Sequence, residues 1–340
     1  MINQKKIAER AGVSRATVSR AFTQNTNVSP KTLAKIQDAM VSLGLKPLAY
    51  LPNGEQKRVN YVLVIAGDIS NYFYSKIIQG ICDQLTSLGI MTVVCNSNYE
   101  SQMEEEQIAF ANANNYLGII MVTAMEHPTL SEALKKSRIP TIFVNRYIHS
   151  VDTDVVCINN YMGGYMAASY LIENGHKQIA YIATLKDSTP QEDRIKGFAT
   201  AIHDLRVSME NYQVFYGESS VLRGKQVVSE LIAQGMPYTA IFVADALVAV
   251  GIVNTLKVHN FRIPEDVSIL CFDDSPYIDE SGLSLSTVKY DPYPMGQATA
   301  NALIQRLSDP VNGGHHLYLI PRLVERKSVK NLTRTEDRSL

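Results

Sequence analysis

The sequence lacks the features that mark membrane, secreted and disulfide-linked proteins. No run approaches the ~20 consecutive apolar residues that a membrane helix needs. The N-terminal segment MINQKKIAER is charged and is followed by neither an apolar stretch nor a small-residue cleavage site, so we expect a cytoplasmic protein without a membrane partner. Cys82, Cys95, Cys157 and Cys271 stand singly with no CxxC pair, which argues against a disulfide framework and a zinc site and favours buried thiols.

Motifs of catalysis and of nucleotide binding are missing as well. Neither GxGxxG nor GxSxG occurs. The segment GESSVLRGKQ resembles a phosphate loop, but six residues separate Gly217 from Gly224 where about four are needed, and Gln226 replaces the Ser or Thr that binds magnesium. His315 and His316 have no third metal ligand nearby in the sequence. We therefore expect neither an enzyme nor a cofactor or metal site.

Length and composition allow about two domains and a smaller module. The chain has 340 residues, against ~150 for a typical domain, and its 46% hydrophobic and 19% charged residues can bury a sizeable core. The net charge of -1 conceals a split, because residues 1–60 carry ten Lys and Arg against three Asp and Glu, whereas the other 280 carry 22 against 30. This asymmetry predicts a small nucleic-acid-binding head on an acidic body.

Residues 3–44 predict three short helices around a common core. Asn3 can cap the first helix, which ends at the turn Ala11-Gly12-Val13. Ser14 can cap a second helix over residues 15–22. The pair Ser29-Pro30 can start a third, in which four apolar residues recur at helical spacing, Leu33, Ile36, Met40 and Leu43. Two helices joined by a tight turn, with a third closing the core, are typical of a helix-turn-helix.

The rest of the chain predicts a linker and an α/β body. Residues 45–60 contain proline, glycine and charge without a periodicity that could bury a face, which indicates a linker. Short apolar runs typical of strands buried on both faces follow: YVLVIAG, IMTVVCN, GIIMVTA, PTIFVN, QIAYIAT, YQVFYG, AIFVAD and VSILCFDD. Helical patterning separates most of them, so we expect two doubly wound parallel sheets. The polar end, NLTRTEDRSL, is expected to be disordered.

From about residue 3 to about residue 329 the sequence resembles the LacI/GalR family of bacterial transcription regulators. The segment IAERAGVSRATVSRAF matches the family pattern AGVS-x-x-TVSR. DISNYFYSKI resembles the first loop on the effector side of the family's body, and YMGGYMAASYLIENGHKQIAYI resembles the start of its second subdomain. IPEDVSILCFDD and LVERKS match two further stretches in the family's order.

The resemblance implies a small all-α helix-turn-helix head on an α/β body of two periplasmic-binding-protein-like subdomains. The head would span residues 1–46, the hinge 47–59, the body 60–329 and a disordered tail 330–340. The first subdomain would comprise about residues 60–158 and 289–321, and the second about 159–288 and 322–329, linked by three crossovers. Members of the family act as dimers whose effector binds in the cleft between the subdomains.

The second helix of the head is the predicted reader of DNA, because its N-terminal residues face the base edges of the major groove. Arg15 offers a planar fork suited to O6 and N7 of guanine, whereas Ala16 offers only a methyl contact. Arg20 matches the arginine of the family's TVSR and is the second candidate for a base contact. Phosphate contacts and nonspecific attraction are expected from Ser14, Thr17, Ser19, Lys5, Lys6 and Lys31. The alternative is a merely solvated charged helix.

Polar residues at the ends of the apolar runs are candidates for the effector site, because doubly wound sheets bind ligands beyond the carboxyl ends of their strands. Those residues and their neighbours are Asp68, Tyr72, Phe73, Asn145, Arg146, Asp245 and Asp273. The resemblance adds Arg194, which would donate two hydrogen bonds across the cleft, and Ser219, where some members have tryptophan. Carboxylate, amide, guanidinium and aromatic groups together suit a sugar. The alternative is that Asp245 and Asp273 only cap or terminate their strands.

These features predict a dimeric transcription regulator, in the first instance a repressor, that binds operator DNA and responds to a small-molecule effector such as a sugar or sugar derivative. The alternative is a solute receptor with the same body fold, against which the basic head argues. An enzyme is the weakest candidate, because no nucleophile-base motif occurs.

The hinge departs from the family pattern. In the alignment, Gly54 occupies the position of the leucine that typically wedges into the minor groove, and Pro52 lies two residues earlier. Proline removes a helical hydrogen bond and glycine costs ~1 kcal/mol in a helix, so the family's hinge helix should form poorly here. Leu51 is the candidate for a substitute wedge.

A hinge without the leucine wedge should bend DNA less than the family's hinge does, because the wedge unstacks a base step and kinks the duplex. Changing Pro52→Gln and Gly54→Leu together should increase both operator affinity and bending. Bending is measured by the circular-permutation mobility of the bound duplex. A strong central kink with the unmodified protein, or no change in the double variant, would contradict this account of the hinge.

Overall fold

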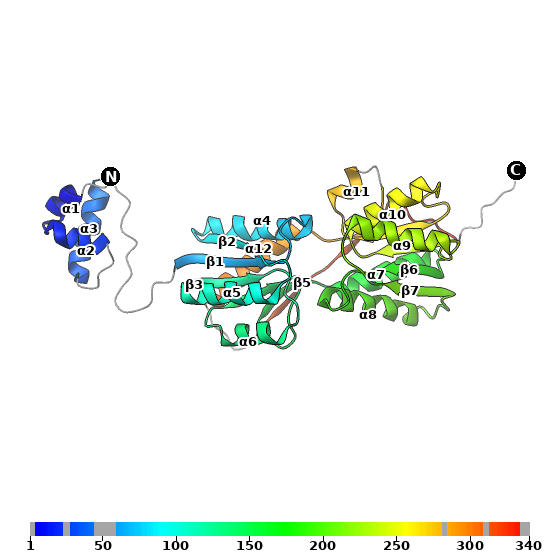
Figure 1. The fold of residues 1–340 in the computed structure, drawn as a ribbon, viewed down its shortest axis with the longest axis horizontal. Coiled ribbons are helices and arrows are strands. Elements are labelled where there is room, and N and C mark those ends of the chain that lie inside the picture. The colour runs from blue at the N-terminus through cyan, green and yellow to red at the C-terminus, as the bar shows by residue number, and fades with distance from the viewer. Residues whose placement is uncertain (1–3, 23–27, 44–58, 281–283, 309–312, 334–340) are drawn as a thin grey trace. The chain divides into compact units, whose positions relative to one another are not determined.

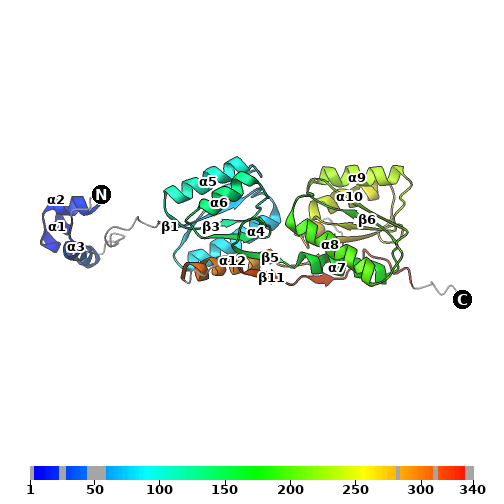
Figure 2. The same ribbon diagram turned by 90° about the horizontal axis from the view of Figure 1, so that it is seen from below.

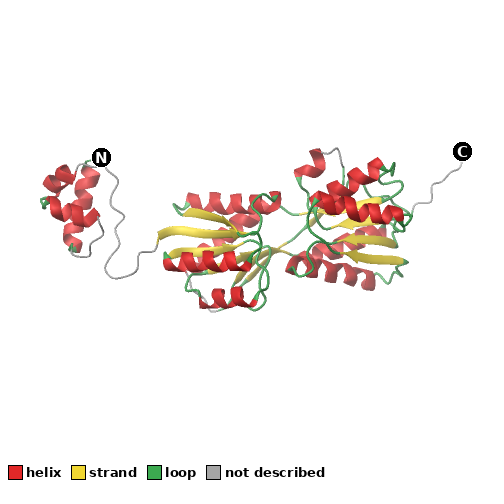
Figure 3. Ribbon diagram, in the orientation of Figure 1, coloured by secondary structure: helices red, strands yellow, loops and turns green. Residues whose placement is uncertain are grey.

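The structure, a computed structural model, describes residues 4–22, 28–43, 59–280, 284–308 and 313–333. The chain divides into two compact units, residues 1–58 and 59–340, which we call the head and the body. The described residues of the head form helices joined by a turn, and the body alternates strands with helices (Figures 1 and 3). The hinge residues Leu51, Pro52 and Gly54 lie outside the described residues, so the account of the hinge stays a prediction.

The head contains the three predicted helices, α1 Gln4–Ala11, α2 Arg15–Phe22 and α3 Pro30–Ser42. Gly12 has a φ of 66° in the turn between α1 and α2, a conformation that favours glycine. Two of the predicted caps form, because the hydroxyl oxygens of Ser14 and Ser29 accept the amides of Thr17 and Thr32 at 3.1 and 3.3 Å, whereas the predicted cap Asn3 lies outside the described residues. The core contains Ile7, Ala8, Val18, Ile36 and Met40, whereas Leu43, predicted to face it, is 39% exposed.

The first lobe of the body is a parallel sheet with helices on both faces. Its strands lie in the order β11-β5-β4-β3-β1-β2. Helices α4 and α12 cover one face, and α5 and α6 cover the other (Figure 2). The bounds are β1 Val59–Ala66, α4 Tyr72–Ser87, β2 Met91–Asn96, α5 Ser101–Ala113, β3 Tyr116–Met121, α6 Pro128–Lys136, β4 Thr141–Val144, β5 Asp154–Ile158, α12 Pro292–Ser308 and β11 His316–Leu319.

The second lobe repeats this architecture, with strands in the order β12-β10-β9-β8-β6-β7. Helices α7 and α8 cover one face of the sheet, and α9 and α10 cover the other. The bounds are α7 Asn160–Glu173, β6 Gln178–Ile182, α8 Thr189–Asp204, β7 Asn211–Phe215, α9 Val221–Ala233, β8 Ala240–Val243, α10 Ala246–Val258, β9 Ser268–Phe272, α11 Pro276–Glu280, β10 Ser286–Lys289 and β12 Arg322–Val324.

The predicted fold class is confirmed, with one exception to its parallel sheets. Each of the eight apolar runs forms a strand, β1–β4 and β6–β9. The runs did not identify β5, β10, β11 and β12, and β12 pairs with β10 in the antiparallel sense. The chain passes between the lobes three times, from β5 to α7, from β10 to α12 and from β11 to β12. No helix among the described residues is long and apolar enough to cross a membrane.

Pairs of glycines let three pairs of helices approach closely. Gly80 and Gly296 lie where α4 meets α12, and a Cβ on either would lie 2.2 or 2.1 Å from a carbonyl oxygen of the other helix. Gly164 and Gly197 do the same for α7 and α8, at 2.0 and 1.9 Å, and Gly224 and Gly251 for α9 and α10, at 2.2 and 2.1 Å. A larger residue at any of these positions would push the two helices apart.

The disordered tail was predicted to begin at residue 330, which is too early in the chain. Residues 330–333 contact the second lobe, because the amide of Leu332 donates to the carbonyl oxygen of Asn174 at 2.8 Å. The segment after Thr333 lies outside the described residues. Of the thiols predicted to be buried, Cys157 and Cys271 are buried, while Cys82 and Cys95 are partly exposed.

His176 connects this C-terminal segment to the second lobe. The imidazole is 1% exposed, its Nε2 donates to the carbonyl oxygen of Lys330 at 3.1 Å, and its Nδ1 accepts from the hydroxyl of Thr239 at 2.9 Å. Burial lowers the pKa of His176 to about 4, although the hydrogen bond to Lys330 opposes this shift.

The protein should lose stability as the pH falls from about 6.5 toward 4, because the unfolded chain binds a proton at His176 that the folded chain resists. This group should lower the free energy of unfolding by roughly 2 kcal/mol between pH 7 and pH 5. The variant His176→Gln should lose correspondingly less in urea titrations at the two pH values.

Comparing the wild type with His176→Gln separates the effect of the imidazole on stability from that of buried carboxyl groups, which change stability with pH in the opposite direction. The pKa values of Glu104 and Asp273 are raised to about 7, so their contribution to stability is present at low pH and is lost as the pH rises through 7. An equal loss in the wild type and in His176→Gln would exclude the imidazole as its source.

Candidate functional site

The second helix of the head presents a cationic surface bearing hydroxyl groups. Arg15 and Ala16 begin α2 and are exposed, and no acidic residue lies in the first turn. The hydroxyls of Ser14 and Thr17 lie 2.8 Å apart, so the helix cap already uses groups that we predicted to contact phosphates. A surface of this kind can approach a phosphate backbone without repulsion from its own carboxylates.

The remaining residues predicted to bind DNA lie on the three helices of the head or outside the described structure. Lys5 and Lys31 are exposed on α1 and α3, and Ser19 is partly exposed on α2. Arg20 lies in α2, but its side chain is not described, and Leu51 lies outside the described residues. The role of each in DNA binding therefore remains a proposal.

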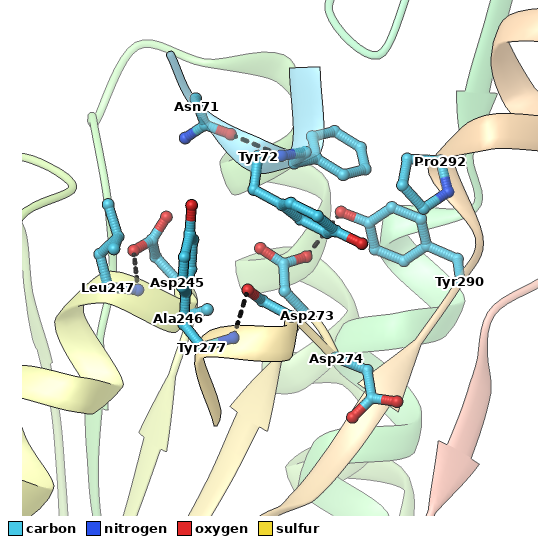
Figure 4. Close-up of a pocket in the computed structure, with 12 residues that line it drawn as sticks. Asn71, Tyr72, Asp245, Ala246, Leu247, Asp273, Asp274, Tyr277, Tyr290 and Pro292 are labelled. Carbon is cyan, nitrogen blue, oxygen red and sulfur yellow. Dashed lines mark hydrogen bonds between the residues drawn. The ribbon is translucent and has the colours of Figure 1, made fainter. Parts of the chain in front are cut away.

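The carboxyl ends of strands from both lobes meet at a cleft in the body. Its volume, including the open mouth, is 1180 Å³. The predicted residues that line it are Asp68, Phe73, Asn145, Arg146, Arg194, Ser219, Asp245 and Asp273. Tyr72 lines an adjoining pocket that shares Phe73, Asp245 and Asp273 with the cleft (Figure 4). The structure thus brings all nine predicted effector residues together.

Arg194 lies on the second-lobe wall and is anchored to that lobe. Its guanidinium is 3.6 Å from the centre of the Phe272 ring, Nε donates to Asn160 Oδ1 at 2.9 Å, and Nη1 donates to the carbonyl oxygen of Ala244 at 3.2 Å. These two hydrogen bonds stay within the lobe and do not cross the cleft. Arg194 is only 7% exposed, so it supports the packing of the lobe as well as lining the cleft.

Asp273 directly follows β9 and projects into the cleft. Its Oδ1 accepts from the hydroxyl of Tyr290 at 2.6 Å. Burial raises the pKa of Asp273 to about 7, and the charge of Asp245 adds to the rise, while Arg194 and the Tyr290 hydrogen bond oppose it. Near neutral pH the carboxyl can therefore either donate or accept a hydrogen bond, which suits a ligand hydroxyl.

The carboxyl group of Asp274 lies in a different environment from that of Asp273. This is expected, because adjacent residues at the end of a strand point in different directions. The Asp274 carboxylate lies 2.6 Å from Lys289 Nζ and 2.7 Å from Arg326 Nη1. Burial opposes ionisation, but the hydrogen bonds and charges of the two cations hold the pKa of Asp274 below its ordinary value. Asp274 is therefore a structural ion-pair partner, and although it is among the residues that line the pocket, its carboxyl group points away from that of Asp273 in Figure 4.

Aromatic rings from the start of α4 face the second lobe. Asn71 caps this helix by accepting the amide of Phe73 at 2.9 Å. The ring of Phe73 packs edge-on to Tyr290, with centres 5.1 Å apart, and Tyr72 packs edge-on to Tyr277 at 5.9 Å. Tyr277 belongs to the second lobe, whereas Tyr290 lies in the connection from β10 to α12 and packs against the cores of both lobes. These rings provide the apolar surface that a sugar ring needs beside its polar contacts.

Asp245 combines a structural role with its place in the cleft. Its Oδ1 accepts the amides of Leu247 and Val248 at the start of α10, while Oδ2 accepts the hydroxyl of Ser219 at 2.6 Å. Asp245 thus caps α10, and its role in ligand binding stays a prediction beside the alternative of a purely structural role. On the first lobe, Asp68 accepts the amide and hydroxyl of Ser70 at 2.9 and 2.6 Å.

Other residues around the cleft were not named as site residues from the sequence, although Asn71 and Tyr74 lie in the segment 68–74 that follows the first apolar run. These are Asn71, Tyr74, Tyr99, Thr184, Ser188, Gln191, Glu218, Tyr277 and Tyr290. The helix-capping position of Asn71 could have identified it, and Tyr290 would have followed from recognising β10. The described residues contain no group of three or more His, Cys, Asp or Glu that could hold a metal ion.

Comparisons with known proteins agree with this arrangement of head and cleft. Residues 4–53 match the family described as bacterial regulatory proteins, lacI family, and residues 168–329 match a periplasmic binding protein-like domain. The chain belongs to the LacI family. The HTH-type transcriptional regulator DegA of Bacillus subtilis (strain 168) is 28% identical to it, over 96% of this chain and 97% of the relative.

Two further comparisons span nearly the whole chain. The ribose operon repressor of Escherichia coli (strain K12) is 24% identical, over 96% of this chain and 100% of the relative. The solved structure of a complex of the transcriptional regulator CelR with cellobiose is 25% identical, with a TM-score of 0.72, over 96% of this chain and 100% of that one. The protein is accordingly a DNA-binding transcription regulator and not an enzyme, and the solute-receptor alternative is not favoured.

Replacing Arg15 should separate base recognition from general attraction to DNA. Arg15→Ala should cost ~1 to 3 kcal/mol of binding free energy at the operator and leave binding to a random duplex nearly unchanged, because a bidentate contact to guanine is lost. Titrations of both duplexes at one salt concentration measure the difference. Equal weakening on both would show that Arg15 contacts only phosphates, and would give the role in base reading to Arg20.

Proposed function

We propose that this LacI-family regulator is a repressor that binds a roughly palindromic operator as a homodimer and is switched by a sugar or sugar derivative in the cleft. The observation that carries the proposal is the chemistry of the cleft, where Asp273, Asp245 and Arg194 of one lobe face Phe73 and Asn145 of the other. Hydroxyl groups both donate and accept, and the aromatic rings match the apolar faces of a sugar. Relatives named for ribose and cellobiose support this class of effector.

The proposed switch is a difference in affinity. An effector that contacts both walls stabilises the cleft geometry in which both sets of contacts form, and operator DNA stabilises the geometry that spaces the two heads correctly. If the two geometries differ, each ligand weakens or strengthens the binding of the other by the same factor. Aromatic contacts such as Tyr72 to Tyr277 join the lobes and would rearrange with the cleft.

A screen for thermal stabilisation tests the effector class. The full-length protein is heated with neutral mono- and disaccharides, sugar phosphates, sugar acids and purines. A ligand at 100 times its dissociation constant should raise the free energy of unfolding by about 2.7 kcal/mol and should also change operator affinity. If only purines act, or if no compound changes operator affinity, the proposed effector is wrong.

Arg194 provides the matched variant for this screen. Arg194→Ala would also open a void against Phe272, whereas Arg194→Met keeps most of the stem and removes the guanidinium. The Met variant should lose the response to an identified sugar while retaining operator binding, and the exposed Arg322→Met, which lies outside the cleft, should retain both. Unchanged calorimetric affinity in Arg194→Met would exclude Arg194 from the effector site.

A further inference from the structure

Arg146 is a buried cation on the first-lobe wall of the cleft whose hydrogen-bonding groups are only partly used. It follows β4, lines the cleft and is 7% exposed. Its Nη2 donates to the hydroxyl of Tyr74 at 3.2 Å, whereas Nη1, also buried, has no hydrogen-bond partner. Buried guanidinium groups are normally paired, because an uncompensated buried charge is costly.

No carboxylate among the described residues compensates this charge at close range. None of the ion pairs in the described structure, all within 4.0 Å, involves Arg146. Glu104 is the carboxyl group whose charge Arg146 influences, and its Oε1 accepts from Ser97 at 2.9 Å. Burial raises the pKa of Glu104 to about 7 even though Arg146 opposes the rise, so this carboxyl is only partly ionised at neutral pH.

The four acids that line the cleft in the described structure have partners other than Arg146, and Glu218 accepts from the hydroxyl of Ser220 at 3.3 Å. Asp68 accepts from Ser70, and Asp245 accepts the first amides of α10 and the hydroxyl of Ser219. Asp273 accepts from Tyr290. Arg146 and Arg194 are the cations that line the cleft in the described structure, and Arg194 is held by Asn160 and Ala244.

The surroundings of Arg146 are built at a conformational cost. Its guanidinium lies 5.7 Å from the centre of the Tyr99 ring. Tyr99 and the preceding Asn98 both have positive φ values, 62° and 52°, which are uncommon for residues other than glycine. The ring lies so close to Gly67 that a Cβ there would be 2.4 Å from it. Two left-handed residues and one glycine therefore hold a phenol beside the arginine.

We infer that Arg146, Tyr74 and Tyr99 form an oxyanion subsite in the cleft, and that the effector is a sugar derivative bearing a carboxylate or a phosphate. The inference rests on the proposed function and narrows its effector class. A neutral hydroxyl would satisfy Nη1 but would leave the charge of the guanidinium unpaired, whereas an anionic oxygen does both. The phenols donate further hydrogen bonds, and the second-lobe acids bind the hydroxyl groups at the other end of the ligand.

Matched ligand pairs test the subsite on the full-length protein. Calorimetry compares D-glucose with D-glucuronate and D-glucose 6-phosphate, D-galactose with D-galacturonate, and D-ribose with D-ribose 5-phosphate. At least one acidic compound should bind about tenfold or more tightly than its neutral partner, because charge-assisted hydrogen bonds are the stronger ones. The carboxylate and phosphate arms identify which of the two anions the subsite takes.

Substitutions test whether Arg146 causes the preference for acidic over neutral compounds. Arg146→Gln should weaken the acidic compound about tenfold or more and change the neutral partner by less than about threefold. Tyr99→Phe, which removes only the phenol oxygen, should weaken the acidic compound by a smaller factor. Arg138→Gln makes the same change of charge at an exposed position of the first lobe outside the cleft, and should change neither affinity.

The stability of the ligand-free protein distinguishes a binding role from a structural one. Because Arg146→Gln removes an unpaired buried charge, its melting temperature without ligand should equal or exceed that of the wild type. A lower melting temperature, acidic compounds that bind no better than neutral ones, or an acid preference that survives in Arg146→Gln would each overturn the subsite. Neutral sugars that bind more tightly than every acidic compound and change operator affinity would overturn it while leaving the proposed function intact.

Discussion

The close helix crossings at glycine pairs are the constraint on which the geometry of the cleft depends. Three helices bring residues to the cleft: α4 at its first residues, α8 through Arg194 and α10 through its cap Asp245. Each is held against a neighbouring helix at a glycine pair with no room for a Cβ. Helices whose backbones are in direct contact cannot easily slide along each other. The helix packing, and not the side chains alone, therefore fixes where the polar groups of the cleft lie.

The pattern of apolar runs identified eight strands, including the partly exposed edge strands β2 and β7, and missed the four others. β4 and β8 read TIFV and AIFV and are buried throughout, whereas β11, HLYL, lies at a sheet edge with three exposed residues. β12 has only three residues and pairs in the antiparallel sense. An exposed edge strand lacks the continuous apolar signal, so its sequence does not distinguish it from a loop. β5 is buried, and its VVCI run could have been recognised.

The candidate site could be predicted wherever a residue ends a strand, because the topology of parallel sheets fixes where such residues go. Asn145 and Asp273 belong to this class, and both take positive φ values at the point where the chain leaves the sheet. Tyr74 and Tyr99 could not be predicted in this way. The first lies within a helix, and the second reaches the cleft through a left-handed bend that no local pattern of residues indicates.

The three passages of the chain between the lobes limit how the body can deform. Since β5, β10 and β11 each lead into the opposite lobe, relative motion of the lobes must bend three connections at once. Such a body can hinge, but it cannot come apart as two domains on a single tether would. Proteolytic cleavage of any one connection would leave the other two intact, and the packing of strands and helices within each lobe would hold the two fragments together, so a nicked protein should remain one particle with both cleft walls attached.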